Sequence, residues 1–344
     1  MGAPGLAGTI PYQCRVSNQE ATVKAIVRHV YGSPEVMHLE EVAQPQPKDD
    51  EVLIQVRAAG TNAADWHLLR GKPFLVRLVF GLLRPRIKIL GADVAGVVAA
   101  VGAKVSGVRP GDEVFGNTSE SGWGTFAEYV CAKADAVAPK PAGCTFEEAA
   151  AVPMAAVTAL QALRDGGRMQ PGHKVLINGA SGGVGTFAVQ IAKAGGAEVT
   201  GVCSTANLDL VRSLGADHVI DYTREDVIRS GQRYDVIMAT AGYHSIFDYR
   251  RALTPSGSYV LVGGDGLVQA MLLGPLLSLG GRRKLGSILS RPTQADLRHV
   301  KELIEAGKLR SVIDRRYPLA EVPEAIGYVE AGHAKGKVVI TVSP

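Results

Sequence analysis

Apolar residues follow two different rhythms along the chain, and the change comes near residue 140. Between residues 23 and 138, short apolar runs such as 51–56 (EVLIQV) and 94–102 (VAGVVAAVG) are separated by Gly, Pro and charged residues, which is typical of a β-rich domain. After residue 141, helical stretches alternate with apolar runs. Strands alternating with helices predict a parallel, doubly wound sheet, so we expect an α/β protein. The predicted strands of this part are 174–178, 198–203, 218–221, 234–239 and 258–263.

Length and composition fit a globular protein of about two domains. The chain has 344 residues, 46% hydrophobic and 20% charged, and its net charge of +4 is too small to indicate a nucleic-acid partner. Residues 1–22 have no periodicity and no secretory-signal pattern, which predicts a loose N-terminal extension. The four cysteines lack metal-ligand spacing, so we interpret them as isolated thiols and expect a cytoplasmic location.

A glycine-rich turn follows the first predicted strand of the second half. Residues 173–178 (HKVLIN) run into 179–185 (GASGGVG), a helix is expected to begin near Thr186, and a second strand lies at 197–203. Small residues let the backbone approach a phosphate, and a helix N-terminus offers free N–H groups and a favourable dipole. The context predicts a dinucleotide site rather than a simple turn. The residues expected to contact the phosphates are Gly179, Ser181, Gly182, Gly183 and Val184.

The end of the second strand indicates which dinucleotide is preferred. An acidic residue there would bind the ribose hydroxyls of NAD and repel a 2′-phosphate. This chain has Ser204, Thr205 and Asn207 at that place, all able to donate hydrogen bonds to a phosphate. NADPH is therefore the expected cofactor. The same residues could also cap the next helix, which begins near Leu208, and the two roles are compatible.

Six motifs together resemble one superfamily. They are 62–66 (NAADW), 90–96 (LGADVAG), 109–114 (RPGDEV), 179–185, 214–217 (LGAD) and 336–339 (GKVV). With them the chain is similar to zinc-independent medium-chain dehydrogenases/reductases, in the quinone oxidoreductase branch that includes zeta-crystallin and enoyl reductases. The resemblance implies a GroES-like catalytic domain from residues 23–145 and 295–344, and a Rossmann NADPH-binding domain from 146–294. It places the last strand, 337–342, in the catalytic domain.

Zinc ligands of the wider superfamily are replaced in this chain. Where zinc relatives carry a cysteine and a His-Glu pair, this sequence has Asn62 and Ala92-Asp93, and no four-cysteine lobe is present. No metal site is therefore expected, and without a Lewis acid an activated acceptor is the natural substrate. The resemblance implies hydride transfer from NADPH to a quinone or an α,β-unsaturated carbonyl. Alternatives are a zinc-free aldehyde or ketone reductase, and a non-catalytic NADPH-binding protein.

The resemblance also assigns roles near the nicotinamide. Asn62 should donate an amide hydrogen bond to the substrate oxygen as it gains charge, unless it only stabilises the turn after Gly60. Trp66 should line the pocket. Asp65 is either catalytic or a structural acceptor in its turn.

Further cofactor contacts are implied at the other motifs. The Thr158 hydroxyl should face the nicotinamide or its ribose, or else bond to its own helix backbone. Tyr222 should lie beside the adenosine phosphate, or simply be a half-buried residue at a strand end. Lys337 could reach the nucleotide from the other domain, although a solvated lysine is the alternative. Three glycines that follow two later strands should border the same crevice: Gly242, Gly263 and Gly264.

Two segments, 74–86 and 267–291, are both apolar and basic, and neither is long enough to cross a bilayer. Each could cover a hydrophobic substrate pocket or contact anionic lipid, and the usual position of ligands between domains favours the pocket. The expected partners are thus a small hydrophobic carbonyl or quinone substrate, a second copy in a homodimer, and at most a weak membrane-surface contact.

Overall fold

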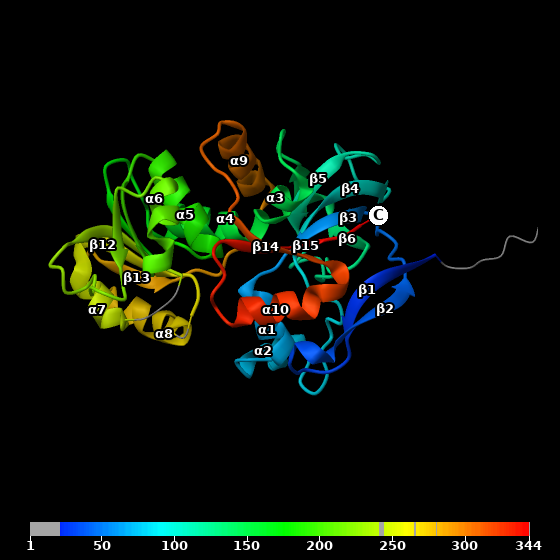
Figure 1. Cartoon of the computed structure of the whole chain (residues 1–344), viewed down its shortest axis with the longest axis horizontal. Helices are drawn as coiled ribbons and strands as arrows, with labels where there is room; N and C mark the ends of the chain where they lie inside the picture. Colours follow the sequence, from blue (N-terminus) through cyan, green and yellow to red (C-terminus); the bar gives the residue numbers. More distant parts are fainter. Residues whose placement is uncertain (1–20, 241–243, 265, 280, 344) are drawn as a thin grey trace, which may run out of the picture.

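Two lobes make up the protein in the computed structural model, which describes residues 21–240, 244–264, 266–279 and 281–343 (Figure 1). One lobe combines the blue and cyan N-terminal elements with the red C-terminal strand. Within the described residues it contains the β1 (Thr22–Arg28) and β2 (Met37–Ala43) pair and a seven-stranded sheet, in which β6 (Tyr129–Lys133) pairs with β3 beside the main path. The main path is β14 (Ile313–Pro318), β15 (Lys337–Thr341), β3 (Glu51–Gly60), β4 (Asp93–Val101), β5 (Glu113–Asn117) and β7 (Val137–Pro139).

The second lobe, green to yellow in Figure 1, is built on a six-stranded sheet whose neighbouring strands are all parallel. Strand order reverses beside β8, and ligands bind at such switch points in doubly wound folds. The predicted α/β class and parallel sheet are confirmed, although β12 begins earlier than the strand predicted near residue 258. The order is β10 (His218–Asp221), β9 (Glu198–Cys203), β8 (Lys174–Asn178), β11 (Tyr234–Ala239), β12 (Leu253–Leu261) and β13 (Lys284–Ser287).

Helices begin where local chemistry allows, and one of them begins earlier than the sequence predicted. The helical segment between residues 146 and 161 is interrupted before Pro153, because proline has no N–H group and suits the first turn of a new helix. The helix expected from Thr186 already begins at Gly183. The helices are α1 (Ala63–Arg70), α2 (Leu75–Phe80), α3 (Phe146–Ala150), α4 (Pro153–Gln161), α5 (Gly183–Ala194), α6 (Leu208–Ser213), α7 (Ile246–Ala252), α8 (Leu267–Leu277), α9 (Gln294–Glu305) and α10 (Val322–Glu330).

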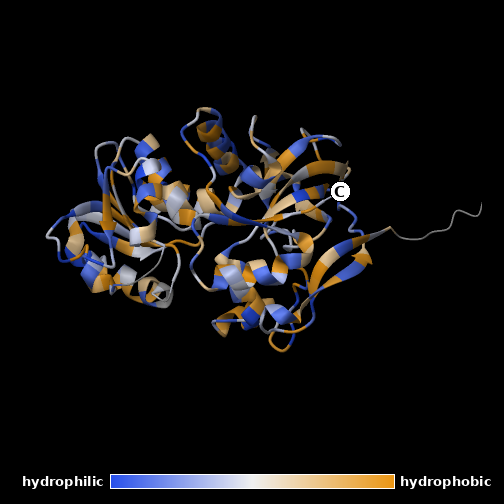
Figure 2. Ribbon diagram, in the orientation of Figure 1, coloured by the Kyte–Doolittle hydropathy of each residue, from blue (hydrophilic) through white to orange (hydrophobic). Residues whose placement is uncertain are grey.

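Small buried side chains join the two lobes. Ala58 and Ala95, from β3 and β4, belong to the same core cluster as Ala156 and Ala159 of α4, and all four are fully buried. Alanines at such a contact let the backbones approach closely, so α4 packs against the sheet of one lobe and against α5 of the other. Figure 2 shows largely apolar strands in both lobes beneath more polar helix surfaces. This packing also holds the start of α5 next to the first lobe.

Candidate active site

The turn after β8 forms a backbone cradle at the start of α5. Gly179 has a φ of 82°, in the left-handed region, and a Cβ on Gly185 would lie 2.0 Å from the Gly179 carbonyl oxygen. Gly182 provides no side-chain cap for α5, and the N–H groups of Gly183 and Val184 have no protein acceptor among the described residues. Free N–H groups at a helix N-terminus bind phosphate. These residues therefore fit the pyrophosphate of a dinucleotide.

The C-terminal strand β15 closes one side of this cradle. The Gly336 N–H group donates to the Ser181 carbonyl oxygen at 2.9 Å, and Gly336 also forms a β-bridge with Gly182. A Cβ on Gly183 would lie 3.2 Å from Cδ of Lys337, so the aliphatic part of this lysine packs beside the loop. The fold thus brings Lys337 to the glycine loop from the other lobe.

The ammonium group of Lys337 lies in a buried polar cluster. It donates to Asn62 Oδ1 at 2.6 Å and to the Thr61 carbonyl oxygen at 2.8 Å, and it is 3.5 Å from Asp93 Oδ2. Lys337 is 3% exposed and Asp93 is 0% exposed. Burial lowers the pKa of Lys337, and the nearby carboxylate of Asp93 opposes this shift. The solvated lysine considered from the sequence is therefore wrong.

The Asn62 side chain is held on both sides. Its Nδ2 atom donates to Asp93 Oδ2 at 2.9 Å and more weakly to the Gly60 carbonyl oxygen at 3.4 Å, while Oδ1 accepts from Lys337. Both amide hydrogens thus have acceptors inside the protein, whereas the sequence-based hypothesis had the amide donate to a substrate oxygen. This geometry favours the alternative, in which Asn62 stabilises the turn after Gly60.

Asp65 and Trp66 follow on helix α1 and differ in environment. Asp65 is fully buried, and its carboxylate accepts hydrogen bonds from the N–H groups of Asn62 at 2.7 Å and Gly91 at 3.0 Å. Burial raises the pKa of Asp65 to about 7, although these two hydrogen bonds act in the opposite direction. Asp65 therefore ties the start of α1 to the segment before β4. Trp66 is half-buried and stacks on His67, with ring centroids 3.6 Å apart.

Asp93 connects this cluster to two further elements. Its Oδ1 atom accepts from Asn117 Nδ2 at 2.8 Å, at the end of β5, and from the Met154 N–H group at 2.9 Å, in α4. Sequence reasoning treated Asp93 only as a residue in place of a zinc ligand. The available signal was a carboxylate at the start of an otherwise apolar strand. The structure makes it the centre of the buried cluster.

The polar side chains at the end of β9 form hydrogen bonds with one another and with neighbouring elements. Asn207 Nδ2 donates to Ser181 Oγ at 3.1 Å and Ser204 Oγ at 3.2 Å, and Thr205 Oγ1 donates to a carboxylate oxygen of Asp221. The donor groups of Asn207 and Thr205 are thus already used in hydrogen bonds within the protein. The hydroxyls of Ser181 and Ser204 accept these bonds and have no acceptor among the described residues. The end of β9 itself carries no carboxylate, but the neighbouring strand β10 contributes Asp221 beside it.

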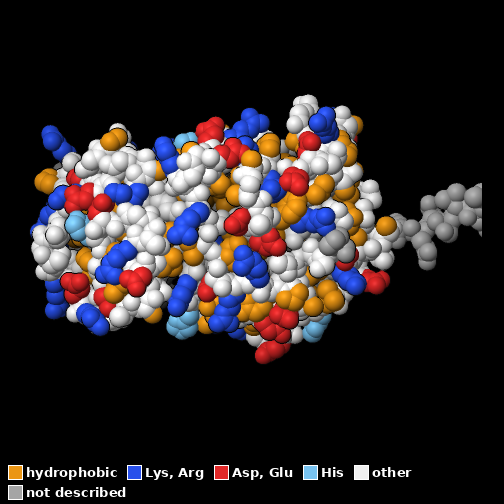
Figure 3. All heavy atoms as spheres, turned by 45° about the horizontal axis from the view of Figure 1, so that its top comes forward, with side chains coloured by type: hydrophobic (Ala, Val, Ile, Leu, Met, Phe, Trp, Pro, Cys, Tyr) orange, Lys and Arg blue, Asp and Glu red, His pale blue; other side chains and the backbone are white. Residues whose placement is uncertain are grey.

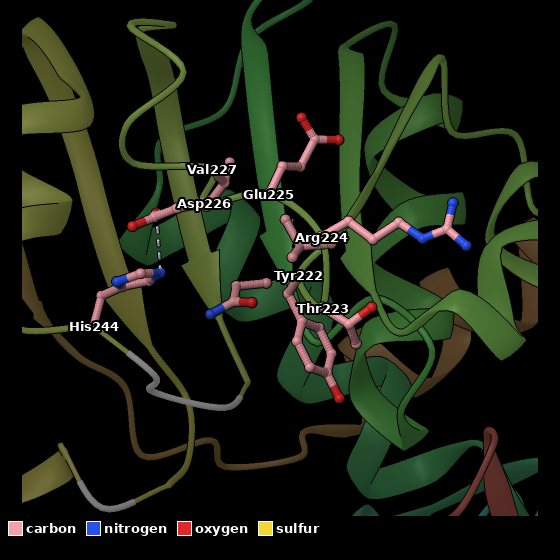
Figure 4. A pocket seen from close by; sticks show the side chains of 9 residues that line it. Tyr222, Thr223, Arg224, Glu225, Asp226, Val227 and His244 are labelled. Atoms are coloured by element: carbon pink, nitrogen blue, oxygen red, sulfur yellow. Dashed lines mark ion pairs between the residues drawn. The ribbon is translucent and has the colours of Figure 1, made fainter.

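A cavity of about 420 Å³ adjoins these residues at the carboxyl ends of the parallel strands (Figure 4). Tyr222 is 48% exposed and lines it. Arg224 reaches out on one side, 3.5 Å from Asp221, and the ion pair of Asp226 with His244 lies on the other. A hydrogen bond from Thr205 lowers the pKa of Asp221. Sequence reasoning missed Arg224, because a single basic residue after a strand is a weak signal. The lining residues are Asn178, Val202, Tyr222, Thr223, Arg224, Glu225, Asp226, Val227 and His244.

The remaining expected contacts lie outside the lining of this cavity. Thr158 is 8% exposed in α4, and its hydroxyl makes no hydrogen bond to the described part of the chain. Gly263 and Gly264 follow β12, and Gly242 lies outside the described residues. No group of three or more His, Cys, Asp or Glu in the described ranges is placed to hold a metal ion.

Family models match most of both lobes. Residues 48–142 match the model described as "Alcohol dehydrogenase GroES-like domain", which confirms the expected fold of the first lobe. Residues 214–340 match the model described as "Zinc-binding dehydrogenase".

Individual relatives extend over nearly the whole chain. The chain is 34% identical over 321 residues to "Quinone-oxidoreductase homolog, chloroplastic" of Spinacia oleracea, covering 90% of this chain and 94% of that protein. It is 32% identical over 340 residues to "NADPH-dependent alkenal/one oxidoreductase, chloroplastic" of Arabidopsis thaliana, covering 92% and 79%. The solved quinone oxidoreductase of Coxiella burnetii superposes with a TM-score of 0.85 at 30% identity, covering 94% of this chain and all of that one.

Proposed function

Because this chain belongs to the medium-chain dehydrogenase/reductase superfamily, in its quinone oxidoreductase-like branch, we propose that it transfers a hydride from NADPH to a quinone or an α,β-unsaturated carbonyl without zinc. The family makes it an oxidoreductase that uses a nicotinamide cofactor and a small-molecule substrate. The observation that carries the proposal is the glycine cradle at α5, which β15 joins to the buried cluster of Asn62, Asp93 and Lys337. NADPH supplies the hydride, and the protein positions the reactants.

The side chains at the expected metal position support chemistry without zinc. Asn62 is a weak metal ligand, Ala92 has no donor atom, and the Lys337 ammonium group already lies between Asn62 and Asp93. A divalent cation bound to Asn62 and Asp93 would be repelled by the Lys337 ammonium group. The ammonium group instead faces the buried Asp93 carboxylate and balances its charge.

Two features beside the cavity support a preference for NADPH. The Ser204 hydroxyl is available to donate, and the Arg224 guanidinium lies on the rim of the cavity, where it can bind a phosphate. Asp221 would oppose a 2′-phosphate by charge repulsion. However, its oxygens already accept bonds from Thr205 and Thr223 and pair with Arg224.

A homodimer is supported by the outer edge of the second lobe. Strand β13 pairs with β12 and is the last strand of its sheet, and α8 packs on it, with Ser278 Oγ accepting from the Leu285 N–H group at 2.9 Å. On its outer side, α8 exposes Leu272 and Leu276 by 66% and 61%. A two-fold contact between copies would cover this apolar face.

Turnover and product analysis test the proposed reaction. Purified protein is mixed with NADPH or NADH and a panel of quinones, enones, aldehydes and ketones, with and without a chelator. We expect NADPH to be consumed with quinones or enones, the C=C bond of the enone to be reduced, and the chelator to have no effect. Reduction of the C=O bond instead supports the aldehyde or ketone reductase, while cofactor binding without turnover supports the non-catalytic alternative. Bound zinc that is lost together with activity would overturn the zinc-free mechanism.

A further inference from the structure

Helix α2 presents apolar side chains on two opposite faces. Val76 and Phe80 are partly buried and pack against the core of the first lobe. Leu75, Leu78 and Val79 point outward and are 63%, 58% and 64% exposed. A surface helix of a soluble domain normally carries polar residues on its outer face. The outer face of α2 therefore lacks an apolar contact among the described residues.

The apolar surface continues beyond both ends of α2. Phe74 is 62% exposed before the helix, and Leu82 and Leu83 are 53% and 88% exposed after it. Isolated exposed hydrophobic residues are ordinary, but a dense group of them usually marks an interaction site. We call this group the α2 patch: Phe74, Leu75, Leu78, Val79, Leu82 and Leu83.

Specific contacts hold the α2 patch on the body of the first lobe. The Tyr31 hydroxyl donates to the Gly81 carbonyl oxygen at 2.7 Å, which fixes the turn after α2. The Arg77 guanidinium donates to the Gly71 carbonyl oxygen at 3.2 Å and lies 4.7 Å from the centre of the Tyr31 ring. The patch is thus displayed by an anchored element and not by a loose loop.

The segment of the chain that carries the patch has charges of one sign. Residues 66–92 contain six Lys and Arg and no Asp or Glu, so the rest of the chain, with 31 basic and 33 acidic side chains, carries a net charge of −2. Arg84, Arg86 and Lys88 are exposed next to the patch, and none of them pairs with an acidic residue in the described ranges. On the face drawn in Figure 3, by contrast, acidic and basic side chains are intermingled.

We propose that the α2 patch, together with Arg84, Arg86 and Lys88, is a docking surface for an anionic lipid bilayer. Apolar side chains can enter the boundary between headgroups and acyl chains while neighbouring Arg and Lys bind lipid phosphates. A two-fold contact between copies through this surface would bring like charges together, which disfavours a second chain as its occupant. No helix among the described residues is long and apolar enough to cross a membrane, so the contact would be peripheral. This proposal does not depend on the proposed reaction.

Vesicle sedimentation tests the docking surface directly. The full-length protein is mixed with vesicles of phosphatidylcholine alone, or with about 30% phosphatidylserine added, at low and at physiological salt. We expect binding to the anionic vesicles only, and weaker binding as salt increases. Arg84→Glu/Arg86→Glu should reduce the partition coefficient at least about tenfold, since each basic residue near an anionic surface contributes about 1 kcal/mol. Leu78→Ser/Leu82→Ser should reduce it several-fold.

Matched controls separate the patch from general charge and stability. Arg233→Glu/Arg298→Glu changes the net charge equally at exposed positions elsewhere, and Leu39→Ser removes an exposed leucine from β2; both should bind like the parent. The same cosedimentation with neutral vesicles, or an equal loss in the charge control, would overturn the proposal. So would failure of the parent protein to bind at low salt. A change of oligomeric mass in Arg84→Glu/Arg86→Glu would instead assign the surface to a second copy of the chain.

Discussion

Lys337 serves both halves of the candidate site with different parts of one side chain. Its aliphatic part borders the glycine loop, and its ammonium group binds Asn62, the Thr61 carbonyl and Asp93. A buried charge is tolerated only when an opposite charge and hydrogen-bond partners surround it. Removing one member of a buried ion pair therefore lowers the free energy of unfolding by more than the intact pair contributes to it.

Replacement of Lys337 should therefore be costly for folding. Lys337→Met keeps the aliphatic volume but leaves the buried Asp93 carboxylate without its cation, so we expect the free energy of unfolding to fall by about 3–5 kcal/mol. Urea denaturation measures this change. Lys335→Met, at an exposed position two residues away, should change it little. A loss below about 1 kcal/mol would mean that Asp93 is stabilised by its other hydrogen bonds alone.

Arg224 provides a separate prediction about cofactor choice. Arg224→Ala should weaken NADPH binding about tenfold, or ~1.4 kcal/mol, and leave NADH binding nearly unchanged, because only NADPH carries a 2′-phosphate. Dissociation constants from calorimetry test this without turnover. Arg212→Ala is the control, since Arg212 is also exposed and also pairs with an aspartate three residues earlier in the chain, and neither residue lines the cavity. Equal weakening of both cofactors would remove Arg224 from the 2′-phosphate site.

At the scale of elements, the turn between β8 and α5 depends on residues without side chains. The Gly185 position is closed by the carbonyl oxygen of Gly179, while the N–H groups of Gly183 and Val184 remain free at the helix N-terminus. Any shift of this turn would displace those N–H groups from the phosphate position.

A single methyl group should disturb this element. In Gly185→Ala the new Cβ would lie 2.0 Å from the Gly179 carbonyl oxygen, so the loop must move. We expect a stability loss of about 1–3 kcal/mol and much weaker dinucleotide binding. Thermal unfolding with and without NADPH measures both. The control is Gly286→Ala in β13, where a Cβ meets no atom within 4 Å. Unchanged stabilisation by NADPH in Gly185→Ala would show that the phosphates bind elsewhere.

For the molecule as a whole, the exposed apolar face of α8 should determine the oligomeric state. The parent protein should sediment as a dimer, and Leu272→Glu/Leu276→Glu should sediment as a monomer, because charges would be buried in the contact. Analytical ultracentrifugation measures the mass. Leu78→Glu in the α2 patch should remain a dimer. A monomeric parent, or a dimer unaffected by the α8 variant, would contradict this assignment.

The strands β8–β11, the position of the glycine turn, the β-rich first lobe and the α/β class could be predicted from local sequence. Each of these rests on neighbouring residues: apolar runs of strand length, glycines where the backbone must turn, and the regular alternation of strands and helices. The family resemblance added the C-terminal strand to the first lobe. Because these features depend on residues close together in the chain, they can be predicted without knowledge of tertiary contacts.

Which polar groups face each other depends on the tertiary structure. Lys337 and Asp93 lie 244 residues apart, and nothing near either one indicates that the lysine is buried against the carboxylate. Thr205 donates to Asp221 because β9 and β10 are neighbours in the sheet, so a carboxylate from β10 lies beside a strand end that carries none itself. The Asn62 amide likewise donates to Asp93, a contact that the sequence does not reveal. Burial and hydrogen bonding depend on what the fold brings into contact, and strand order and lobe packing set those contacts across the whole chain.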